Sequence, residues 1–386
     1  MKLRLLDHLV CPLDKTTLEL QPWETSTRQM AAEETARAER LGVDPTKVST
    51  EVLQGVLINR QRKLLYPIHH GVPRMLTFRT GVVDRFREEH SGRLRREFNG
   101  FSFANESSKA GESEVLRSFS SEWTNYDWTG QTYWSLTPTA WFKCMRFVLE
   151  LEQKPIRDRL VLEAGMGIGG VADYLAREEG CEIVGMDLSY AVDVGYQHFG
   201  QNPFLHIVQG SVFATPFPEQ TFDFVYSFGV IHHTFSTKTA LASLAQLPRR
   251  GGRLYVWVYS PHDESRTLIR RGMMTLERML RPVISRLPEK AQAVALAPII
   301  PLYLGHQWWQ AKRGDGSVVP YGIREAVHAA RDRFTPRYIH RHTESEVSAW
   351  FHEVGYDQLF CGSQHEPCEY LPVFFTACTG VSGIRR

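Results

Sequence analysis

The feature that most constrains the fold is an alternation of strand-like and helix-like segments that begins at Leu160. Apolar runs such as LVLEA, EIVGMD and FDFVYSF are separated by segments with helical periodicity, such as GGVADYLAREEG. Strands that alternate with helices form a parallel sheet with helices on both faces. The sequence therefore predicts an α/β fold with a doubly wound sheet. Further strands are expected at FLHIVQG, GRLYVWVYS, YDQLFCG and LPVFFTACTG, which makes seven in all.

The rest of the chain is divided around that sheet. Its 386 residues, 42% of them hydrophobic, are enough for one large core and a smaller domain. The interval of about 80 residues between Ser260 and Arg341 is too long for a plain loop, and apolar residues recur in it at helical spacing. We expect a small α+β domain at 1–78, a connector with aromatic-rich helices covering the site at 79–150, the core at 151–262 and 343–386, and a helical cap inserted at 263–342.

Charge and cysteine content exclude several classes of protein. Lys and Arg number 45 against 43 Asp and Glu, so the formal charge of +2 gives no general attraction to nucleic acids or anionic membranes. Six dispersed cysteines without a C-x-x-C pair favour a reducing cytoplasm over a disulfide framework. The longest apolar stretch, 291–304, contains two prolines and is too short to cross a bilayer. We expect a cytoplasmic protein without a membrane span, with a homodimer left open.

A glycine-rich segment is the first candidate for a ligand site. Glu163-Ala164-Gly165-Met166-Gly167-Ile168-Gly169-Gly170 follows a predicted strand and opens a predicted helix. Glycines let the main chain approach a ligand closely, and the amides of a helix N-terminus face it. Asp187 ends the next strand, where a carboxylate can accept both hydroxyls of a ribose. Because the glycines also satisfy G-x-G-x-x-G, a dinucleotide-binding dehydrogenase and a purely structural turn stay open at this point.

Three later segments separate these alternatives. Gln209-Gly210-Ser211-Val212 follows the third predicted strand, Gly229 to Thr234 follows the fourth, and Gly251-Gly252 precedes the fifth. In this order, over about residues 119–378, the motifs resemble the small-molecule class I S-adenosylmethionine-dependent methyltransferases, whose sheet is Rossmann-like. The resemblance implies S-adenosyl-L-methionine as the cofactor and S-adenosyl-L-homocysteine as its product. The residues that it implies as cofactor contacts are Glu163, Ala164, Gly165, Gly167, Gly169, Asp187, Leu188, Gly210, Ser211, Val212, Ser227 and Phe228.

Two neighbouring histidines are the candidates for the catalytic base. A sulfonium already activates the methyl group, so the protein must align donor and acceptor and remove the acceptor's proton. His232 and His233 follow the fourth strand, and imidazole titrates near neutral pH, although either ring can instead support the loop. The resemblance favours His233, assisted by Tyr126 with Tyr133 in reserve. Amino-directed DNA and protein methyltransferases of this class commonly carry Asn-Pro-Pro-Tyr after the fourth strand, and this chain does not. We therefore expect a small-molecule acceptor that reacts through oxygen or an activated carbon.

Aromatic and basic side chains suggest where the acceptor binds. Aromatic residues are dense before the core and recur in the predicted cap, while arginines crowd residues 331–341. An arginine there can bind a carboxylate or phosphate, but a solvated basic face and ordinary helix packing are the alternatives. The predicted acceptor contacts are Trp123, Tyr133, Tyr303, His306, Trp309 and Arg337.

The first 78 residues carry a second resemblance. L-x-x-L-x-C-P ends at Pro12, and Leu65-Tyr66-Pro67-Ile68 and Gly71 to Leu76 follow. These motifs resemble the zinc-ribbon-type activator subunits of tRNA and release-factor methyltransferases. In that family paired cysteines can hold zinc, whereas this segment keeps only Cys11, and one thiolate cannot make a tetrahedral site, so we predict no metal. Two rival functions stay open, a methyltransferase acting on tRNA or protein and a non-catalytic methyltransferase-like binding module.

Overall fold

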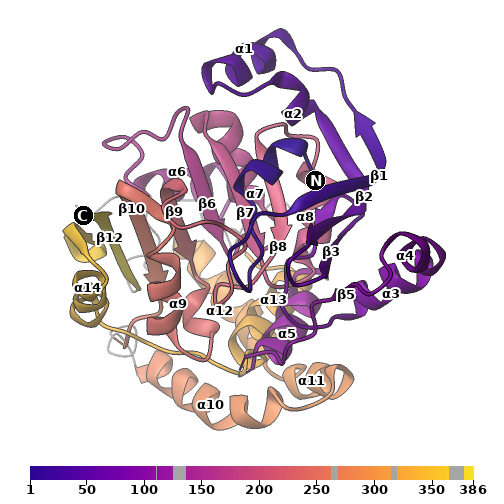
Figure 1. Ribbon diagram of the computed structural model, residues 1–386. Coiled ribbons are helices and arrows are strands. Elements are labelled where there is room, and N and C mark those ends of the chain that lie inside the picture. The colour runs from indigo at the N-terminus through magenta and orange to yellow at the C-terminus, as the bar shows by residue number, and fades with distance from the viewer. Residues whose placement is uncertain (110, 125–135, 262–267, 314–319, 365–377) are drawn as a thin grey trace.

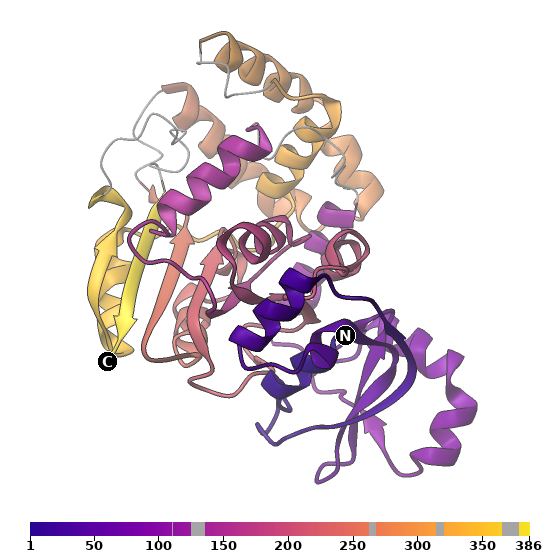
Figure 2. The same ribbon diagram turned by 90° about the horizontal axis from the view of Figure 1, so that it is seen from above.

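The computed structural model describes residues 1–109, 111–124, 136–261, 268–313, 320–364 and 378–386. Two sheets and a group of cap helices make up this part of the chain (Figure 1). Figure 2 shows the N-terminal unit on one side of the large sheet and the C-terminal strand on the opposite side.

The larger sheet has seven strands in the order β11-β12-β10-β9-β6-β7-β8. The strands from β8 to β10 pair in parallel, and β12 is antiparallel to both of its neighbours. This order confirms the predicted doubly wound α/β sheet. The strands are β6 (Leu160–Ala164), β7 (Glu182–Asp187), β8 (Leu205–Gln209), β9 (Phe222–Phe228), β10 (Pro248–Val258), β11 (Tyr356–Cys361) and β12 (Thr379–Arg385).

Only the end of the segment predicted as the last strand lies in the described residues. The apolar segment LPVFFTACTG was expected to form it, but β12 runs from Thr379 to Arg385, and residues 365–377 lie outside the described residues. Pairing with β10, which covers Arg253↔Ile384 to Val258↔Thr379, determines where β12 lies. An apolar run alone does not locate that register, because either end of such a run can pair.

Helices cover the larger sheet, and four more make up the segment predicted as a cap, here called the cap. The chain order reverses between β6 and β9, so a crevice is expected where their carboxyl ends diverge. Around the core lie α6 (Pro138–Val148), α7 (Gly170–Tyr174), the π-helix η2 (Leu175–Glu179), α8 (Ala191–Phe199), the 3-10 helices η3 (Ile231–His233) and η5 (Gly362–Gln364), α9 (Thr237–Leu244) and α14 (Glu344–Glu353). The cap contains α10 (Leu268–Ile284), α11 (Glu289–Leu296), α12 (Ile300–Arg313) and α13 (Ile323–Phe334).

The N-terminal unit has its own sheet, in which β1 to β4 pair antiparallel and β5 pairs parallel to β3. Its strand order is β1-β2-β3-β4, with β5 beside β3. The strands are β1 (Glu19–Thr27), β2 (Thr50–Asn59), β3 (Leu64–His69), β4 (Val72–Pro73) and β5 (Ser102–Phe103), and the helices are η1 (Leu3–His8), α1 (Ala32–Arg40), α2 (Pro45–Ser49), α3 (Gly81–Glu89), α4 (Ser91–Glu97) and α5 (Glu112–Thr124). The chain begins with η1, in which Leu5 and His8, three residues apart, are both buried.

The two sheets are joined along β8. Arg74, just after β4, bridges in parallel to Gln209 at the end of β8, and the Met75 amide donates to the Gln209 carbonyl at 2.8 Å. The buried Arg74 guanidinium pairs with Asp193 on α8. On the same side Arg4 donates to Glu182 of β7 at 2.8 Å. The N-terminal unit is therefore attached to the edge of the larger sheet through main-chain and charged contacts.

No described helix combines the length and the apolar character needed to span a membrane.

Candidate active site

The loop after β6 is held in a shape that glycine allows. Gly165 has φ of +89° and its amide donates to the Met186 carbonyl at 2.7 Å. A Cβ added at Gly165 would lie 2.3 Å from Val230 Cγ2, so any larger residue would collide with the segment after β9. Gly167 and Gly169 also have positive φ, and α7 starts at Gly170. The predicted glycine loop thus lies between a strand end and a helix start, with Ala164 as the last residue of β6.

Asp187 fastens this loop to the neighbouring strand. Its Oδ2 accepts from the Gly167 amide at 2.9 Å, while Oδ1 accepts from the Ser189 amide and hydroxyl at 2.8 and 2.7 Å. Burial raises the pKa of Asp187. Since two carboxylate oxygens have about four lone-pair positions, Asp187 can still accept from a ligand's hydroxyls.

Glu163 is a buried carboxyl with one oxygen that lacks a partner among the described residues. Its side chain is only 6% exposed, and Oε2 has no hydrogen-bond partner among the described residues. Burial raises the pKa of Glu163 to about 8, and the nearby Asp187 adds to that increase. A buried carboxyl of this kind suits a ligand that brings a cation or a hydrogen-bond donor. Together with the glycine cradle, it fits the amino acid end of S-adenosylmethionine.

The next two strand ends supply a second half of the crevice. The Gly210 amide donates to the Asp187 carbonyl at 3.0 Å. The Ser211 hydroxyl donates to Glu112 and accepts from the Phe213 amide, and Val212 packs against the main hydrophobic core. Leu188 packs with Leu116 in a small apolar cluster that also contains Leu76 and Phe78. The residues predicted for the adenine end are therefore adjacent to those predicted for the ribose.

One face of α5 lies against the loops that follow β8, β7 and β6. Glu112 meets Ser211, Leu116 meets Leu188, and the Ser120 hydroxyl accepts from the Tyr190 amide at 3.0 Å. At the end of the helix the Trp123 indole would lie 3.3 Å from a Cβ placed on Gly167. These four positions, 112, 116, 120 and 123, share one helical face. Only Trp123 was predicted from the sequence, although the i, i+4, i+8, i+11 spacing of the four was visible there.

Ser227 and Phe228 end β9 next to the loop. The Ser227 hydroxyl donates to the Ala164 carbonyl at 2.9 Å. The Phe228 ring stacks on Trp257 at 4.3 Å between centroids and meets Trp141 edge-on at 6.0 Å. Ser227 therefore links two strand ends of the crevice, while Phe228 belongs to an aromatic cluster that reaches α6.

The two histidines lie on η3 beneath α5. His233 is 2% exposed, and its ring lies 5.2 Å from Phe119 and 4.1 Å from His232. His233 Nδ1 is 3.0 Å from the Tyr338 carbonyl, which can only accept, so Nδ1 carries the proton and Nε2 of the neutral ring is an acceptor. Burial lowers the pKa of His233 to about 4 and lowers that of His232 as well. Both rings are therefore neutral near pH 7.

A layer of buried polar groups connects α13 to these histidines. The Tyr259 hydroxyl, at the end of β10, donates to Asp332 of α13 at 3.2 Å, and its ring lies 4.1 Å from that of His232. His328, one turn before Asp332, lies 3.6 Å from Glu122 of α5. Burial raises the pKa of Asp332 to about 6 and raises that of Glu122. The sequence pattern did not predict this layer, because its members come from three distant segments.

The predicted acceptor residues of the cap are spread over several environments. Tyr303 is half-buried in a small cap core with Ile299 and Phe334, whereas His306 and Trp309 are exposed on α12. Arg337 pairs with Glu114 of α5. Tyr126 and Tyr133 lie outside the described residues. Among the described candidates, Trp123 has the closest recorded contact with the glycine loop.

The arginines of residues 331–341 point largely to internal partners. Glu277 of α10 is fully buried and lies 3.0 Å from Arg281, 3.1 Å from Arg341 and 3.6 Å from Arg333. Arg331 donates to Ser121 of α5 at 2.6 Å. These contacts join the basic segment to α10 and α5, which differs from the solvated basic face given as the alternative.

The degenerate zinc-ribbon position is filled by neutral and acidic hydrogen-bonding groups. Cys11 Sγ lies 3.3 Å from the Tyr66 hydroxyl, and Asn59 Nδ2 donates to Asp14 at 3.0 Å. Within the described ranges no group of three or more His, Cys, Asp or Glu side chains has the arrangement of a metal site.

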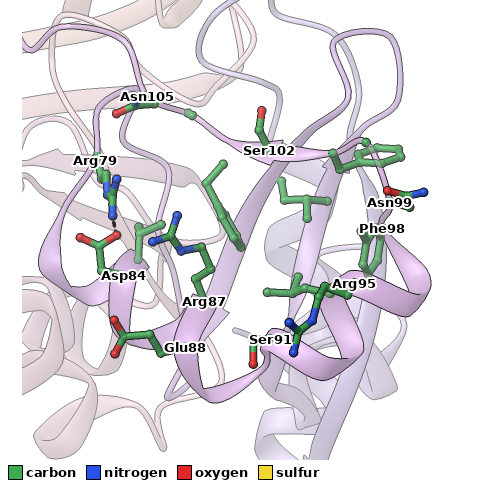
Figure 3. A pocket seen from close by; sticks show the side chains of 17 residues that line it. Arg79, Asp84, Arg87, Glu88, Ser91, Arg95, Phe98, Asn99, Ser102 and Asn105 are labelled. Carbon is green, nitrogen blue, oxygen red and sulfur yellow. Dashed lines mark hydrogen bonds and ion pairs between the residues drawn. The ribbon is translucent and has the colours of Figure 1, made fainter.

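A hollow of about 700 Å³ lies on the connector (Figure 3). The Arg79–Asp84 ion pair borders it at one side, and apolar rings such as Phe98 and Phe103 line it between α3, α4 and β5. Its lining contains no residue of the crevice at β6, β7 and β9, so it is a separate cavity.

Two family models match this chain. Residues 162–256 match the Methyltransferase domain, and residues 2–71 match the Trm112p-like protein. The first interval contains the glycine loop, Asp187, Ser211 and both histidines. The second contains β1 to β3 and Cys11.

Curated relatives match within the same region. Sterol 24-C-methyltransferase of Eremothecium gossypii is 31% identical over 125 residues, which are 31% of this chain and 34% of that protein. Malonyl-[acyl-carrier protein] O-methyltransferase of Enterobacter lignolyticus is 34% identical over 94 residues, 24% of this chain and 36% of that protein. The chain thus spans about a third of the length of the relatives it matches.

Solved structures are similar at lower identity. Magnesium protoporphyrin IX methyltransferase (ChlM) from Synechocystis with bound SAM is 13% identical, with a TM-score of 0.40 over 73% of this chain and 100% of that one. A complex that contains the Haloferax volcanii Trm112 methyltransferase activator gives 13% identity and a TM-score of 0.36 over 64% of this chain and 90% of that one. By the two family matches, together with the sheet order and the glycine loop, residues 162–256 form a methyltransferase-type domain and residues 2–71 form a Trm112p-like region.

Proposed function

We propose that this chain transfers a methyl group from S-adenosylmethionine to an oxygen or activated carbon of a small metabolite, with His233 as the base. The observation that carries the proposal is the glycine loop, which is joined to Asp187 by the 2.9 Å hydrogen bond from Gly167 and borders Glu163, whose Oε2 has no partner among the described residues. This combination matches the shape and charge of an amino acid linked to a nucleoside. The methyltransferase family match supports the same cofactor.

Each part of the crevice has a role in this proposal. Glu163 would hold the ammonium group of the cofactor, since that cation satisfies the buried carboxyl. Asp187 would accept the ribose hydroxyls, and Leu188 with Val212 would enclose the adenine. Trp123 would exclude water from the side of the glycine loop. When bound, the cofactor supplies a methyl group that its sulfonium has already activated.

Deprotonation of the acceptor would fall to His233. Its Nδ1–H is committed to the Tyr338 carbonyl, which fixes the ring and leaves Nε2 to take the proton. His232, with the Tyr259 ring at 4.1 Å, would support that position from behind. The proposal also keeps Tyr126, which lies outside the described residues, as the residue that assists His233 in this deprotonation.

The acceptor class is inferred from what the chain carries and what it lacks. An oxygen or carbon acceptor is favoured by the missing Asn-Pro-Pro-Tyr after β9. The two relatives named above are a sterol C-methyltransferase and a malonyl-[acyl-carrier protein] O-methyltransferase, which supports the same pair of acceptor atoms. A natural-product, sugar or lipid-linked intermediate fits this class.

Calorimetry with the purified chain tests the cofactor. We expect S-adenosylhomocysteine to bind and NADH not to bind, and Asp187→Asn to weaken S-adenosylhomocysteine by about 10- to 100-fold, the range of a lost charge-assisted hydrogen bond. Asp84→Asn, on the connector, is the control and should bind normally. Binding of NADH alone would assign the crevice to a dehydrogenase, and failure to bind either would leave a non-catalytic module.

A macromolecular acceptor is the second candidate. It is favoured by the Trm112p-like region at residues 2–71. The segment just after this region attaches to β8 through Arg74 and Met75, which holds the region beside the methyltransferase domain. The near-neutral charge of +2 weighs against a tRNA acceptor. A gel shift with tRNA at low salt tests it. A salt-sensitive complex supports this candidate, and the absence of a complex excludes tRNA as the acceptor.

A further inference from the structure

The cap carries an unusual amount of exposed apolar surface. Eight large apolar side chains of the described chain are more than a third exposed, and all of them fall between residues 276 and 323. They are Leu276, Met279, Val283, Val294, Leu302, Trp308, Trp309 and Ile323. Scattered exposed apolar residues are normal, but their concentration in one short segment marks an interaction surface.

Helix α10 has two opposed faces. Met274, Glu277 and Ile284 are at most 5% exposed, and Ile284 packs in the small core of the cap. Met279 and Val283 lie one turn apart on another face and are 70% and 61% exposed. A helix on the surface of a soluble protein is expected to be polar on its outer face. The outer face of α10 is therefore apolar without a partner from the described chain.

Helices α11 and α12 extend this surface. Both pack on α13, as α10 does, so the three helices surround one small core and turn their other faces outward. Val294 of α11 is 76% exposed, and Trp308 and Trp309 of α12 are 54% and 48% exposed. In Figure 1, α10 and α11 form the edge of the molecule remote from β1 and β2.

The same three helices are strongly basic. Residues 268–313 contain eight Arg and Lys and two Glu, a net charge of +6, whereas the whole chain carries +2. Of the two acids, Glu277 is fully buried among arginines. Arg286 and Lys290 are exposed at the junction of α10 and α11, and the Lys312 ammonium lies 3.9 Å from the Trp308 ring centroid.

We propose that the outer surface of α10, α11 and α12 docks on an anionic lipid bilayer. Helices that lie in a membrane interface combine an apolar face, tryptophans and a basic flank, and all three are present here. The charge of the cap is complementary to anionic headgroups, and a second copy of the same basic surface would repel it. Lys and Arg stems can also lie along apolar surface while their heads stay in water.

Docking would bring the crevice close to its acceptor. The cap is connected to the crevice through α13, which packs on α5, and α5 covers the glycine loop. This consequence rests on the proposed methyl transfer, and it narrows the acceptor to a lipid or a lipid-linked molecule. The docking surface itself needs neither cofactor nor acceptor.

Vesicle sedimentation of the full chain tests the proposal. We expect binding to phosphatidylcholine vesicles that contain phosphatidylglycerol, at least about tenfold stronger than to phosphatidylcholine alone, and weakened by salt. Met279→Ser with Val283→Ser should reduce binding about fivefold or more at unchanged melting temperature, because both side chains are already exposed. Arg286→Glu with Lys290→Glu should reduce it similarly, while the matched pair Arg85→Glu with Arg96→Glu, on α3 and α4, should not.

Three results would overturn it. The first is that the chain does not bind anionic vesicles at low salt. The second is that only the α3 and α4 pair of substitutions weakens vesicle binding. The third is that the chain is a dimer that does not bind vesicles and that dissociates in Met279→Ser with Val283→Ser. The last result would assign the surface to a second copy of the chain. Calorimetry with S-adenosylhomocysteine on the same samples keeps the two proposals apart, since a chain that binds the cofactor but no vesicles refutes only the docking surface.

Discussion

The indole ring of Trp123 lies over Gly167 so closely that a Cβ on the glycine would be 3.3 Å from it. Gly167 in turn donates to Asp187, so a side chain of α5, the glycine loop and the end of β7 form one continuous unit. The cover of the crevice is therefore built from a helix that precedes the methyltransferase domain in the sequence.

Removing that cover should weaken cofactor binding. We expect Trp123→Ala to reduce the affinity for S-adenosylhomocysteine by about tenfold or more, because the loop and its ligand lose an aromatic contact worth ~1.5–3 kcal/mol. Trp123→Phe should retain most of the affinity. Trp308→Ala, at an exposed site, is the control, and calorimetry is the measurement. Equal affinities for all four proteins would show that Trp123 only packs α5.

Gly165 should not tolerate a side chain. At φ of +89°, with Val230 2.3 Å from the added Cβ, Gly165→Ala is expected to cost ~1–3 kcal/mol of unfolding free energy and to lower cofactor affinity. Adding Val230→Ala should restore only part of the loss, since the backbone strain persists. Gly92→Ala in α4, where the nearest atom is 3.6 Å away, is the control and should be neutral or stabilising. If urea unfolding gave the same free energy of unfolding for Gly165→Ala and Gly92→Ala, the proposed strain at Gly165 would be contradicted.

Cofactor affinity should rise with pH through Glu163. Its pKa of about 8 in the folded chain lies above the usual 4.5, so between those values the folded state holds a proton that the unfolded state has lost. Stability contributed by this group is therefore lost as pH rises toward 8. A cationic ligand favours the ionised carboxylate, so binding should release a proton over the same range. Calorimetry in buffers of different ionisation enthalpy measures it, and Glu163→Gln should abolish both effects.

His233 should affect turnover and leave cofactor binding nearly unchanged. We expect His233→Ala to lower methyl transfer by ~10²–10⁴-fold, measured as label passed from the cofactor into a lipid and small-molecule extract. Because the folded pKa is about 4, the rate should be flat around pH 6.5, where a solvated histidine would titrate. The unfolded histidine gains its proton first as pH falls from 6.5 to 4, so stability is lost in that window. A fully active His233→Ala would remove it from the mechanism.

Glu277 should be essential for the cap. It is fully buried with three arginines nearby, so Glu277→Gln is expected to cost ~3–5 kcal/mol by leaving buried cations without an anion. Glu289→Gln is the matched control, since that carboxylate is 60% exposed and pairs with Arg331 at the surface. Glu289→Gln should lower the free energy of unfolding by no more than ~1 kcal/mol. Urea unfolding of the two variants would contradict the assignment if they lost the same stability.

The sequence alone determined the elements that depend on local pattern. The positions of β6, β7 and β9, the glycine loop and Asp187 were all predicted, because strand and helix periods and the need for positive φ are properties of neighbouring residues. The seven-stranded sheet follows from the order of those elements. The family resemblance added the cofactor, since its motifs occur at set points along that order.

Only the tertiary structure decided which distant segments meet. Glu112 and Ser211 are 99 residues apart, and Arg341 and Glu277 are 64 apart, so no local period predicts that the first pair closes the crevice or that the second turns a basic segment inward. The same holds for Met279 and Val283, whose spacing was correctly taken as helical but whose exposed face depends on what packs against α10. A helical period tells which residues share a face, and the partner of that face is set by the packing of the whole chain.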